Sequence, residues 1–502
     1  MEKIELKYIL QELDENIVLD NEQIAILEEM DHNIFIIAGA GSGKTTTMVA
    51  KIKYLVEYKQ IKPYDILLIA FTKQAVLELR HKLWDQLGIY VSIVTFHKLG
   101  LEIIKRQSGE QKIITDVKTE IDRLIAAIVQ VDLQFFRQLK QYLGVHFNHS
   151  YEQICLLPSY IQFLSDIVTV LEQKRVRQTE IRMNRKNIVN RRKNALFIDL
   201  YIYLEMVYYH HMAQRKQIDF TMMIDEATTC LQQKTVEVEY RYIMVDEYQD
   251  ISRNRLALLK ALEQQTKAYI IAVGDDWQAI YHFSGSDHRL FRQFTEYFSL
   301  AKVFYLLQTY RNSQELIDVA GAFVMKSSEH LPKQLTSGKH CCQPLQLLYC
   351  FPCNCIKRIL CLLDHLNKQG PKIIYFLGRY QHDIRILQSI KVLRIKGGII
   401  ESDQFPNLTM YFFTVHAVKG LGCDEVIILN MTNKQYGFPA NVSKNNILTL
   451  LEDQSWSQEL EERRLFYVAL TRTKHRVYII VPWIGKSSYI REIKKESMKK
   501  FF

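Results

Sequence analysis

The chain has 502 residues and a mass of 59.2 kDa, and 48% of its residues are hydrophobic while 24% are charged. This composition excludes a disordered, collagenous or fibrous chain, and the length suggests about three domains. The 65 lysines and arginines exceed the 55 aspartates and glutamates, and the resulting net charge of +10 favours polyanionic partners mildly.

Signals for targeting and for disulfide formation are sparse. The first residues mix charges and lack the apolar core of a signal peptide. No uncharged apolar stretch approaches the roughly 18 residues that a membrane span requires. Nine cysteines are too few for a disulfide scaffold. We therefore expect a cytoplasmic protein with reduced thiols and no membrane partner.

The first third of the chain alternates between apolar runs and helical segments. Asn33–Ala38 is an apolar run that leads into glycines, and a helix is predicted to start near Lys44. Asp65–Ala70 is a second buried-strand candidate, followed by a helix through Arg80. This alternation favours a parallel sheet with helices on its faces.

The pattern changes from about Glu102 to Asn194, where glycine and proline become scarce and helical periodicity dominates. This change predicts a helical insert. The insert ends in a basic stretch, Lys174–Lys193, which contains nine lysines and arginines and one glutamate.

Strand signals return in the second half of the chain. The later runs are expected to build a second parallel sheet, covered by helices such as Glu315–Met325 and Leu460–Leu470. The predicted strands are Tyr242–Val245, Tyr269–Val273, Leu345–Tyr349, Lys372–Leu377, Leu408–Thr414, Val426–Leu429 and Val477–Val481.

A candidate phosphate site lies between the first strand and its helix, at Ala38–Thr45. Small residues let backbone N–H groups surround phosphate oxygens, and the helix N-terminus adds a positive dipole end. Lys44 would bridge the β- and γ-phosphates, and the Thr45 hydroxyl would ligate Mg²⁺. The strict motif has glycine where this chain has Ala38. The alternative is a glycine-rich turn before an ordinary helix.

Two acids follow the strand Tyr242–Val245 directly. The carboxyl end of a parallel strand would place them beside the phosphate loop. Asp246 would hold Mg²⁺, and Glu247 would orient or deprotonate the attacking water. A solvated acidic turn is the alternative.

Three further polar residues fit the same site. Gln278 follows the strand Tyr269–Val273 and can hydrogen-bond a γ-phosphate and its attacking water. Arg311 and Arg472 would supply positive charge to the transferred phosphoryl group. If both arginines reach that group, the nucleotide must sit in a cleft between two sheets. Each could otherwise be a surface arginine.

Together these motifs resemble those of the superfamily 1 DNA helicases of the UvrD/Rep type. The segment Val273–Asp287 is similar to the helicase IV branch of that family. The matches keep the order of the family from Asp20 to Lys474. They are Asp20–Gln23, Ala38–Thr45, Ala70–Ala75, Thr95–Gly100, Ile218–Phe220, Asp246–Asp250, Leu307–Ser313, Thr414–Leu421 and Glu461–Arg472.

The resemblance implies an α/β fold with two RecA-like P-loop domains, each with a parallel sheet, and a helical insertion in the first. The implied limits are 1–105 and 195–298 for the first domain (1A), 106–194 for the insertion (1B) and 299–502 for the second domain (2A). The segment between Arg379 and Thr414 is too short for the large accessory insert of UvrD and Rep, called 2B. Domain 2B is therefore expected to be absent or vestigial.

The resemblance also implies ATP and Mg²⁺ as cofactors. Gln23 would read the adenine, Tyr310 would stack on it, and Arg311 and Arg472 would act as arginine fingers. The expected phosphate loop consists of Ala38, Gly39, Ala40, Gly41, Ser42, Gly43, Lys44, Thr45 and Thr46. Lys44, Glu247, Gln278, Arg311 and Arg472 are the expected catalytic residues.

Single-stranded DNA is gripped by aromatic stacking and by electrostatic contacts with its backbone. Such contacts read no sequence, so weak sequence preference and strong salt dependence are expected. Core packing is the alternative for each aromatic residue, and a solvated helix face is the alternative for the basic stretch. The expected DNA contacts are Phe71, Thr72, His97, Tyr281, Phe283, His416 and Lys419.

A cysteine-rich segment raises a separate possibility. His340–Cys342 and Cys350–Cys355 could supply four ligands to zinc. However, Leu345–Phe351 is predicted as a buried strand and Ile356–Leu366 as a core helix that contains Cys361, where cysteine is a small hydrophobe. We therefore expect no metal there.

The sequence predicts an ATP-dependent DNA helicase or translocase that acts on single-stranded and tailed duplex DNA in repair, replication or recombination. A 3′→5′ polarity is implied by the resemblance. The alternative is a DNA-gated ATPase subunit of a larger repair or anti-phage defence complex, in which a protein partner replaces the missing 2B function. A DNA-binding module with a dead ATP site is disfavoured, because every residue needed for hydrolysis is present.

Overall fold

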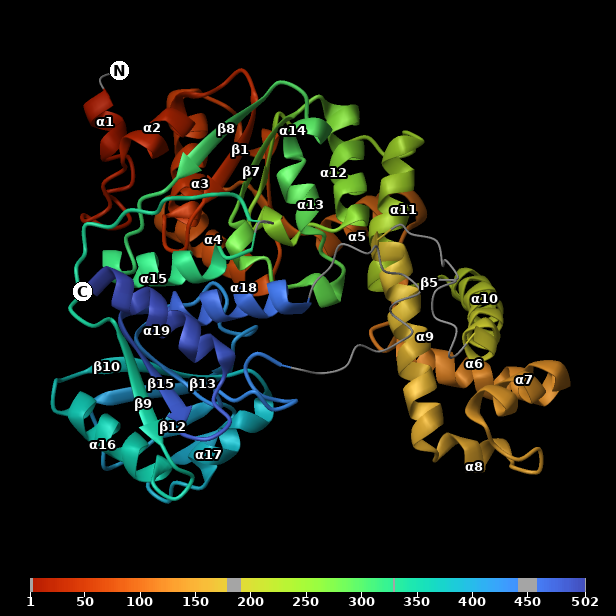
Figure 1. The fold of residues 1–502 in the computed structure, drawn as a ribbon. Helices are drawn as coiled ribbons and strands as arrows, with labels where there is room; N and C mark the ends of the chain where they lie inside the picture. Colours follow the sequence, from red (N-terminus) through yellow and green to blue (C-terminus); the bar gives the residue numbers. More distant parts are fainter. Residues whose placement is uncertain (1–2, 178–190, 328–329, 441–457, 502) are drawn as a thin grey trace.

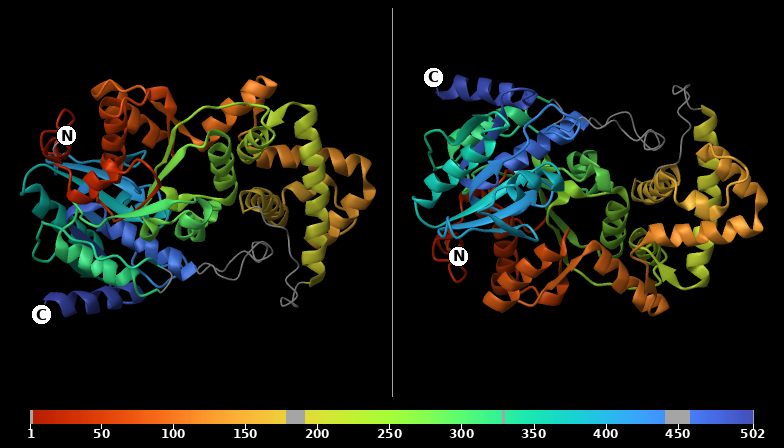
Figure 2. Two further views of the ribbon diagram at one scale, coloured as in Figure 1. Left: turned by 90° about the horizontal axis from the view of Figure 1, so that it is seen from above. Right: turned by 90° about the horizontal axis from the view of Figure 1, so that it is seen from below.

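The computed structural model describes residues 3–177, 191–327, 330–440 and 458–501. Two α/β bodies lie one above the other in Figure 1, and a helical part stands to one side. Figure 2 shows from above and below that the long helix α10 (Arg191–Gln214) runs through this helical part, with orange helical segments on its outer side. The greater part of the predicted basic stretch, residues 178–190, lies outside the described residues.

The first body is built on a six-stranded sheet in which every strand pairs in parallel with its neighbours. We call this body the first lobe. In spatial order the strands are β3 (Ser92–Thr95), β2 (Ile66–Ala70), β6 (Tyr242–Val245), β7 (Tyr269–Gly274), β1 (Asn33–Ala38) and β8 (Ala301–Leu306).

Both faces of the first sheet are covered, which explains why its strands are continuous apolar runs. Along β1, Ile34 and Ile36 point into one core while Phe35 and Ile37 point into the other. The first core is shared with α2 (Asn21–Glu28), α3 (Lys44–Lys53) and α4 (Lys73–Arg80). The second is shared with α5 (Phe96–Ser108), α11 (Phe220–Gln232), α12 (Arg253–Thr266), α13 (His288–Arg292) and α14 (Phe294–Tyr297).

The helical part confirms the predicted dominance of helices after Glu102. It contains α6 (Val117–Val131), α7 (Leu133–Leu143), α8 (Tyr151–Cys155), α9 (Pro158–Arg177) and α10. A short parallel pair, β4 (Lys112–Ile113) with β5 (Gln217–Ile218), joins the two ends of this part. Its apolar side chains continue the second core of the first lobe.

Strand pairing favours domain limits that differ from those implied by the resemblance. Because β4 and β5 close the helical part and β8 pairs with β1, we propose that the insertion spans residues 114–216 and that the first RecA-like unit extends to Leu306. The sequence placed these limits at 106–194 and 298. The outer strand β8 was missed because it is mostly exposed and contains Lys302.

The second body, which we call the second lobe, is built on a seven-stranded sheet. Its spatial order is β11 (Arg394–Lys396), β12 (Ile399–Glu401), β13 (Leu408–Thr414), β10 (Lys372–Gly378), β14 (Cys423–Ile428), β15 (Thr473–Pro482) and β9 (Leu345–Cys350). The predicted strands pair in parallel, and the unpredicted hairpin of β11 and β12 adds an antiparallel edge. This hairpin lies between Arg379 and Thr414, the segment where the resemblance to UvrD and Rep would place the insert 2B.

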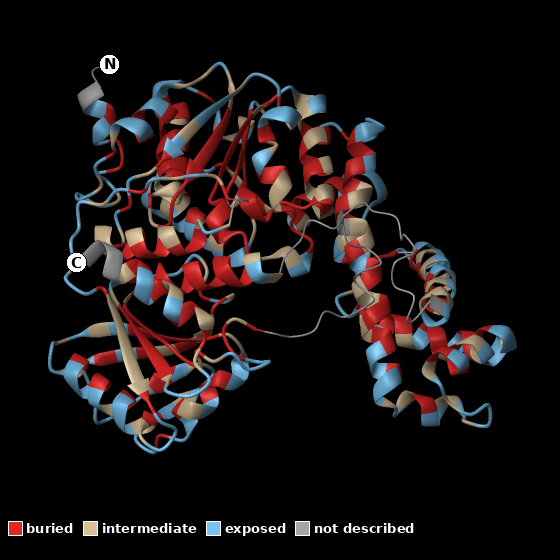
Figure 3. Ribbon diagram, viewed as in Figure 1, coloured by how far each residue is buried: buried red, intermediate tan, exposed pale blue. Residues whose placement is uncertain are grey.

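The predicted covering helices are also confirmed in the second lobe. One face of the sheet packs against α15 (Gln314–Val324), α18 (Gln458–Leu470) and α19 (Ser488–Phe501). The other face packs against α16 (Cys355–Asn367) and α17 (Arg385–Gln388). Buried residues concentrate in the strands of both sheets and on the inward faces of the helices (Figure 3).

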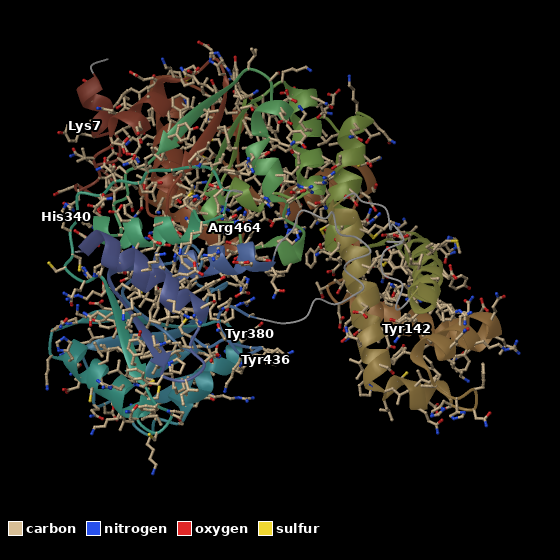
Figure 4. The ribbon with its side chains drawn as sticks, viewed as in Figure 1. Lys7, Tyr142, His340, Tyr380, Tyr436 and Arg464 are labelled. Atoms are coloured by element: carbon tan, nitrogen blue, oxygen red, sulfur yellow. The ribbon has the colours of Figure 1, made fainter. Side chains whose placement is uncertain are left out.

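The two lobes share a packed junction. Ala40, Trp277 and Ile280 of the first lobe belong to the same apolar cluster as α15 and α18. The Trp277 ring meets Tyr467 edge-on, with 5.3 Å between the ring centroids. Arg464 of α18 is labelled at this level in Figure 4. Side chains at the junction can therefore come from both lobes.

Two smaller findings complete the fold. A short helix, α1 (Lys3–Lys7), precedes α2. Within the described ranges, none of the helices combines the length and the apolar character that crossing a bilayer demands.

Candidate functional site

The phosphate loop joins the end of β1 to the start of α3 at Lys44. Gly41 and Gly43 have φ angles of +72° and +81°, a region that residues with a Cβ atom adopt at a cost of about 1–2 kcal/mol. Ala38 is the last residue of β1 and is buried, so its alanine methyl group sits in ordinary extended backbone. The departure from glycine at this position is therefore tolerated.

Thr309 and Tyr310, which follow β8, hydrogen-bond the backbone of the phosphate loop. Tyr310 donates its backbone N–H to the Gly41 carbonyl at 2.9 Å, and the Thr309 hydroxyl donates to the Ala40 carbonyl at 2.8 Å. A methyl group added at Gly41 would lie 2.6 Å from Cβ of Arg311. The loop and Arg311 are thus in direct contact although they are far apart in the sequence.

This contact gives a prediction for Gly41→Ala. The added methyl group would push the loop away from Arg311, and overpacking of this size costs about 1–3 kcal/mol. We expect the dissociation constant of a fluorescent ATP analogue to rise by about 10-fold or more. Gly88→Ala is the control, because Gly88 has a φ of +67° with no atom within 4 Å of the added methyl group. Equal ATP affinity in both variants would contradict the prediction.

The two acids leave β6 beside the phosphate loop, as predicted. Asp246 is buried, and its N–H donates to the Ile69 carbonyl at 3.0 Å. Glu247 has a φ of +51°, a left-handed conformation that costs a non-glycine residue about 1–3 kcal/mol. The surrounding fold holds Glu247 in this conformation, which is typical of functional sites.

The pKa values of Asp246 and Glu247 shift in opposite directions. Burial and the neighbouring charge of Glu247 raise the pKa of Asp246, against the attraction of Lys44. Burial would also raise the pKa of Glu247, but Lys44 and Lys419 attract its charged form and lower that pKa overall. Asp246 is thus a buried carboxylate near a cationic loop, and a divalent cation there would restore its charged form.

The two arginines come from different parts of the chain and meet at this site. Arg472 is buried and donates from Nη2 to Oε1 of Gln278 at 2.9 Å, and from Nε to the Val468 carbonyl at 2.9 Å. Burial and the nearby charge of Arg311 lower the pKa of Arg472 to about 9. The buried Arg472 and the partly buried Arg311 are neighbouring guanidinium groups that hydrogen-bond neutral acceptors, which favours an anionic ligand.

A cavity of about 780 Å³ lies among these residues. It is bounded by both lobes and brings together most of the predicted site. From the nucleotide side it includes Gln23, Gly41, Ser42, Gly43, Lys44, Thr45, Thr46, Asp246, Glu247, Gln278, Tyr310, Arg311 and Arg472. From the DNA side it includes Phe71, Thr72, Tyr281, His416 and Lys419. Ala38, Gly39, Ala40, His97 and Phe283 are not among its lining residues.

The expected adenine contacts lie together at the edge of the cavity. Asp20 accepts a hydrogen bond from the Gln23 N–H at 2.7 Å and one from the Tyr310 hydroxyl at 2.8 Å. The Gln23 amide accepts from the Asp20 N–H at 3.0 Å and donates to the Thr47 hydroxyl at 3.1 Å. An amide has two N–H donors and two lone pairs, so Gln23 keeps one of each for a base.

Several expected DNA contacts have partners within the protein. The Arg255 guanidinium lies over the Phe71 ring, 5.1 Å from its centroid, and the Thr72 hydroxyl caps α4 by accepting from the Ala75 N–H at 3.1 Å. The Tyr281 hydroxyl donates to the His416 carbonyl at 3.3 Å. Phe283 is 60% exposed, and its ring is 5.3 Å from that of His416.

The two expected histidine contacts are neutral at pH 7. Burial and Arg255 lower the pKa of His97 to about 4. Burial, Arg379 and Lys419 lower the pKa of His416 to about 4. Neither imidazole can therefore attract a phosphate as a cation, and each can act only as a neutral hydrogen-bonding group.

Lys419 lies deeper than a surface DNA contact. Its Nζ is 2.5 Å from Oδ2 of Asp250 and 3.9 Å from Oε2 of Glu247, and it lies over the Tyr281 ring. Lys419 thus connects the expected DNA side of the cavity with the expected catalytic carboxylate.

Sequence reasoning missed three polar residues of the site. Gln249 donates from its amide to Glu247, and its Oε1 accepts from the Asp275 N–H at 2.9 Å. Lys333 has a fully buried side chain paired with Asp275. Gln249 and Asp275 lie inside the motifs that the sequence analysis identified, so their positions could have indicated a role in the site. No motif surrounds Lys333.

The zinc alternative finds no support in the described part of the chain, where no group of three or more histidine, cysteine or acidic residues could hold a metal ion. Cys350 and Cys355 are buried at the end of β9 and the start of α16, as small hydrophobes would be. The expectation for Cys361 was wrong, because it lies on the exposed face of α16.

Comparisons with known proteins agree with this geometry. A family model described as the UvrD/REP helicase N-terminal domain matches residues 19–299. A second, described as the UvrD-like helicase C-terminal domain, matches residues 391–482. The first match covers more than half of the chain and contains the phosphate loop, the two acids and Gln278.

Similar curated proteins include three DNA helicases. DNA helicase IV of Escherichia coli is 29% identical over 490 residues, which cover 92% of this chain and 68% of that protein. ATP-dependent DNA helicase PcrA of Staphylococcus epidermidis is 26% identical over 326 residues, 63% of this chain and 41% of PcrA. ATP-dependent DNA helicase Rep of Buchnera aphidicola is 27% identical over 316 residues, 60% of this chain and 44% of Rep. The chain therefore spans less than half the length of the PcrA and Rep relatives.

Proposed function

The chain belongs to the UvrD/Rep helicase family and is an ATP-hydrolysing enzyme of that class, and we propose that it moves along single-stranded DNA and unwinds duplex DNA. The proposed polarity is 3′→5′, the proposed pathway is repair, replication or recombination, and the proposed location is the cytoplasm. The observation that carries the proposal is the single cavity bounded by Lys44, Glu247, Gln278, Arg311 and Arg472.

The residues around this cavity fit ATP with Mg²⁺. The phosphate loop offers backbone N–H groups and the N-terminus of α3 to the phosphates. Thr45 and Asp246 would hold the Mg²⁺ ion, which offsets phosphate charge. Arg311 and Arg472 would stabilise charge on the transferred phosphoryl group, and Glu247 would activate the attacking water.

Lys419 offers a physical route from DNA to hydrolysis. It pairs with Asp250 and lies 3.9 Å from Glu247 on one side of the cavity, and its charge faces Tyr281 on the other. A DNA phosphate that attracts Lys419 would change the charge beside Glu247. We therefore expect ATP hydrolysis to be stimulated by single-stranded DNA.

Alternating contact by the two lobes would move the strand. Phe71, Tyr281 and Phe283 belong to the first lobe, whereas His416 and Lys419 follow β13 of the second lobe. Closure of the lobes around ATP and reopening after hydrolysis would change the distance between these two sets of contacts. Each cycle would then advance the strand by one step.

The second candidate is a DNA-gated ATPase subunit that needs a protein partner to unwind DNA. The observation that supports this candidate is the short β11–β12 hairpin between Arg379 and Thr414. We propose that this hairpin occupies the position at which domain 2B would be inserted. Autonomous unwinding would then depend on a partner that supplies the function of 2B.

Two assays on the purified chain test these proposals. The first measures ATP turnover with and without single-stranded DNA, and the proposed function predicts strong stimulation. The second measures strand displacement on duplexes with a 3′ or a 5′ tail. Displacement of the 3′-tailed duplex alone favours the autonomous helicase, whereas stimulated turnover without displacement favours the gated subunit. An ATP turnover rate that does not change when DNA is added would contradict both candidate functions.

A prediction for DNA binding follows from the exposure of Phe283. Loss of one aromatic stacking partner costs about 1–3 kcal/mol per base, so Phe283→Ala should raise the dissociation constant for single-stranded DNA by about 5- to 150-fold. Fluorescence anisotropy with a labelled oligonucleotide measures this change. Tyr64→Ala is the control, because Tyr64 is 64% exposed just before β2, at the opposite end of the strands. Equal affinities of the two variants would contradict the prediction.

A further inference from the structure

Asp275 is the centre of a buried hydrogen-bond network that joins the proposed catalytic groups. Its N–H donates to Oε1 of Gln249 at 2.9 Å, and the Gln249 amide donates to Glu247. Its Oδ2 accepts from Nε2 of Gln278 at 2.5 Å, and Oε1 of Gln278 accepts from Arg472 at 2.9 Å. Asp275 and Gln249 are each 0% exposed.

Lys333 is the cation of this network. Its Nζ lies 2.5 Å from Oδ1 of Asp275 and 2.7 Å from Oδ1 of Asp276, and all three side chains are almost fully buried. Desolvation lowers the pKa of Lys333, but the attraction of both carboxylates outweighs it and raises that pKa overall. Lys333 therefore stays charged, and breaking such a buried pair by removing one partner is costly.

The same lysine connects the network to both lobes. Its Nζ also donates to the Ala38 carbonyl at 3.1 Å, where the phosphate loop begins. Its segment is tied to α15 of the second lobe, because the Gln314 side chain donates to the Leu335 carbonyl and accepts from the Ser337 N–H at 2.7 Å. A shift of α15 would thus move the Lys333 segment and change the contact between Lys333 and Asp275.

We propose that Asp275 and Lys333 form a positioning pair that fixes the orientations of Gln278 and Glu247 for ATP hydrolysis. The inference rests on the proposed function, and it assigns roles to two residues that are not among the lining residues of the cavity. Asp275 acts on Gln278 through its carboxylate and on Gln249 through its backbone N–H. Lys333 holds the Asp275 carboxylate in place from the junction of the lobes.

The chemistry of the partners determines how each amide is turned. A carboxylate only accepts hydrogen bonds and a guanidinium only donates them. Gln278 therefore must direct its NH₂ group toward Asp275 and its oxygen toward Arg472. The Asp275 N–H likewise takes the oxygen of Gln249, which leaves its NH₂ group for Glu247. Gln278 could turn over if Asp275 lost its charge, whereas the backbone N–H of Asp275 would still hold the oxygen of Gln249.

Asp275→Asn tests the pair, with Asp276→Asn as the matched control. Both variants leave Lys333 one carboxylate, but Asp276 accepts from the Leu331 N–H and not from Gln278. For Asp275→Asn we expect the turnover number of DNA-stimulated hydrolysis to fall by about 10- to 100-fold, because small misplacements of catalytic groups have effects of this size. The Michaelis constant for ATP and the affinity for single-stranded DNA should change by less than about threefold, and Asp276→Asn should keep its turnover.

A double-mutant cycle distinguishes positioning from general destabilisation. If Asp275 acts through Gln278, adding Gln278→Ala to Asp275→Asn should cause little further loss of turnover. Multiplied losses, or equal losses in Asp275→Asn and Asp276→Asn, would overturn the proposal. Lys333→Met is the second variant and should reproduce the Asp275→Asn loss. If either Asp275→Asn or Lys333→Met folds and keeps its turnover, the proposal is also overturned.

A crystal structure of Asp275→Asn provides a readout that needs no hydrolysis. The distance from Nη2 of Arg472 to Oε1 of Gln278 is 2.9 Å in the intact chain and should lengthen beyond hydrogen-bonding range. An unchanged contact would overturn the pairing. Intact protein that fails to hydrolyse ATP with DNA would instead refute the proposed function, so the two failures can be told apart.

Discussion

Replacement of Glu247 by glutamine is expected to lower the turnover number of DNA-stimulated ATP hydrolysis by about 10²- to 10⁴-fold, the range of a lost general base. Glutamine has the same shape but cannot take a proton from water. ATP binding should persist, because the phosphate loop and Lys44 are unchanged. Single-turnover hydrolysis and titration with a fluorescent ATP analogue measure the two effects separately.

The variant should also fold. The Glu247 side chain is 25% exposed. Its substitution removes the repulsion from Asp246 together with the attraction to Lys44 and Lys419, so the two changes oppose each other. Glu78→Gln is the control, since Glu78 borders the same cavity but pairs with Lys82 at 2.7 Å. Hydrolysis by Glu247→Gln within threefold of the unchanged chain would refute the role of Glu247.

The inner strands of the first sheet were predictable because burial on both faces produces continuous apolar runs in the sequence. Asn33–Ala38 and Tyr242–Val245 are continuous apolar runs, and the structure has strands with the same limits. The two edge strands of the first sheet were not predictable in this way. Ser92–Thr95 is short, and β8 contains Lys302 on an exposed surface, so neither gives a long apolar run. Apolar runs therefore revealed the inner strands of the first sheet and missed its two edges, whereas in the second sheet they revealed the edge strand β9 and missed β11 and β12.

The site was predictable where motifs join a strand end to a polar loop. Lys44, Asp246 and Gln278 follow three strands that lie side by side in the first sheet, and parallel strands deliver their carboxyl ends to one edge. The contribution of Arg311 and Arg472 needed the structure, because it depends on how the lobes meet. Lys333 was beyond sequence reasoning, since its role comes from burial next to Asp275.

Placement also changed the interpretation of individual DNA contacts. His97 and His416 were expected to contact the DNA backbone, and burial makes both neutral at pH 7. Lys419 was expected to contact DNA, and its ammonium group also lies close to Asp250 and Glu247. A residue type suggests a role, but its charge and direction depend on neighbours that are distant in the sequence.

The central claim is that the second lobe completes the hydrolytic site of the first, and Arg472 carries this claim. It follows α18 of the second lobe and reaches Gln278 of the first at 2.9 Å. An arginine that stabilises the transferred phosphoryl group contributes about 10³- to 10⁵-fold to the rate. Arg394→Ala is the matched control, because Arg394 belongs to the same lobe and pairs with Asp403 at the surface at 2.7 Å.

The decisive measurement is single-turnover ATP hydrolysis by Arg472→Ala with saturating single-stranded DNA. We expect a rate about 10³-fold or more below that of the intact chain, with the affinity for the ATP analogue within about 10-fold and the Arg394→Ala rate unchanged. A rate for Arg472→Ala close to that of the Arg394→Ala control would show that the first lobe hydrolyses ATP without help from the second.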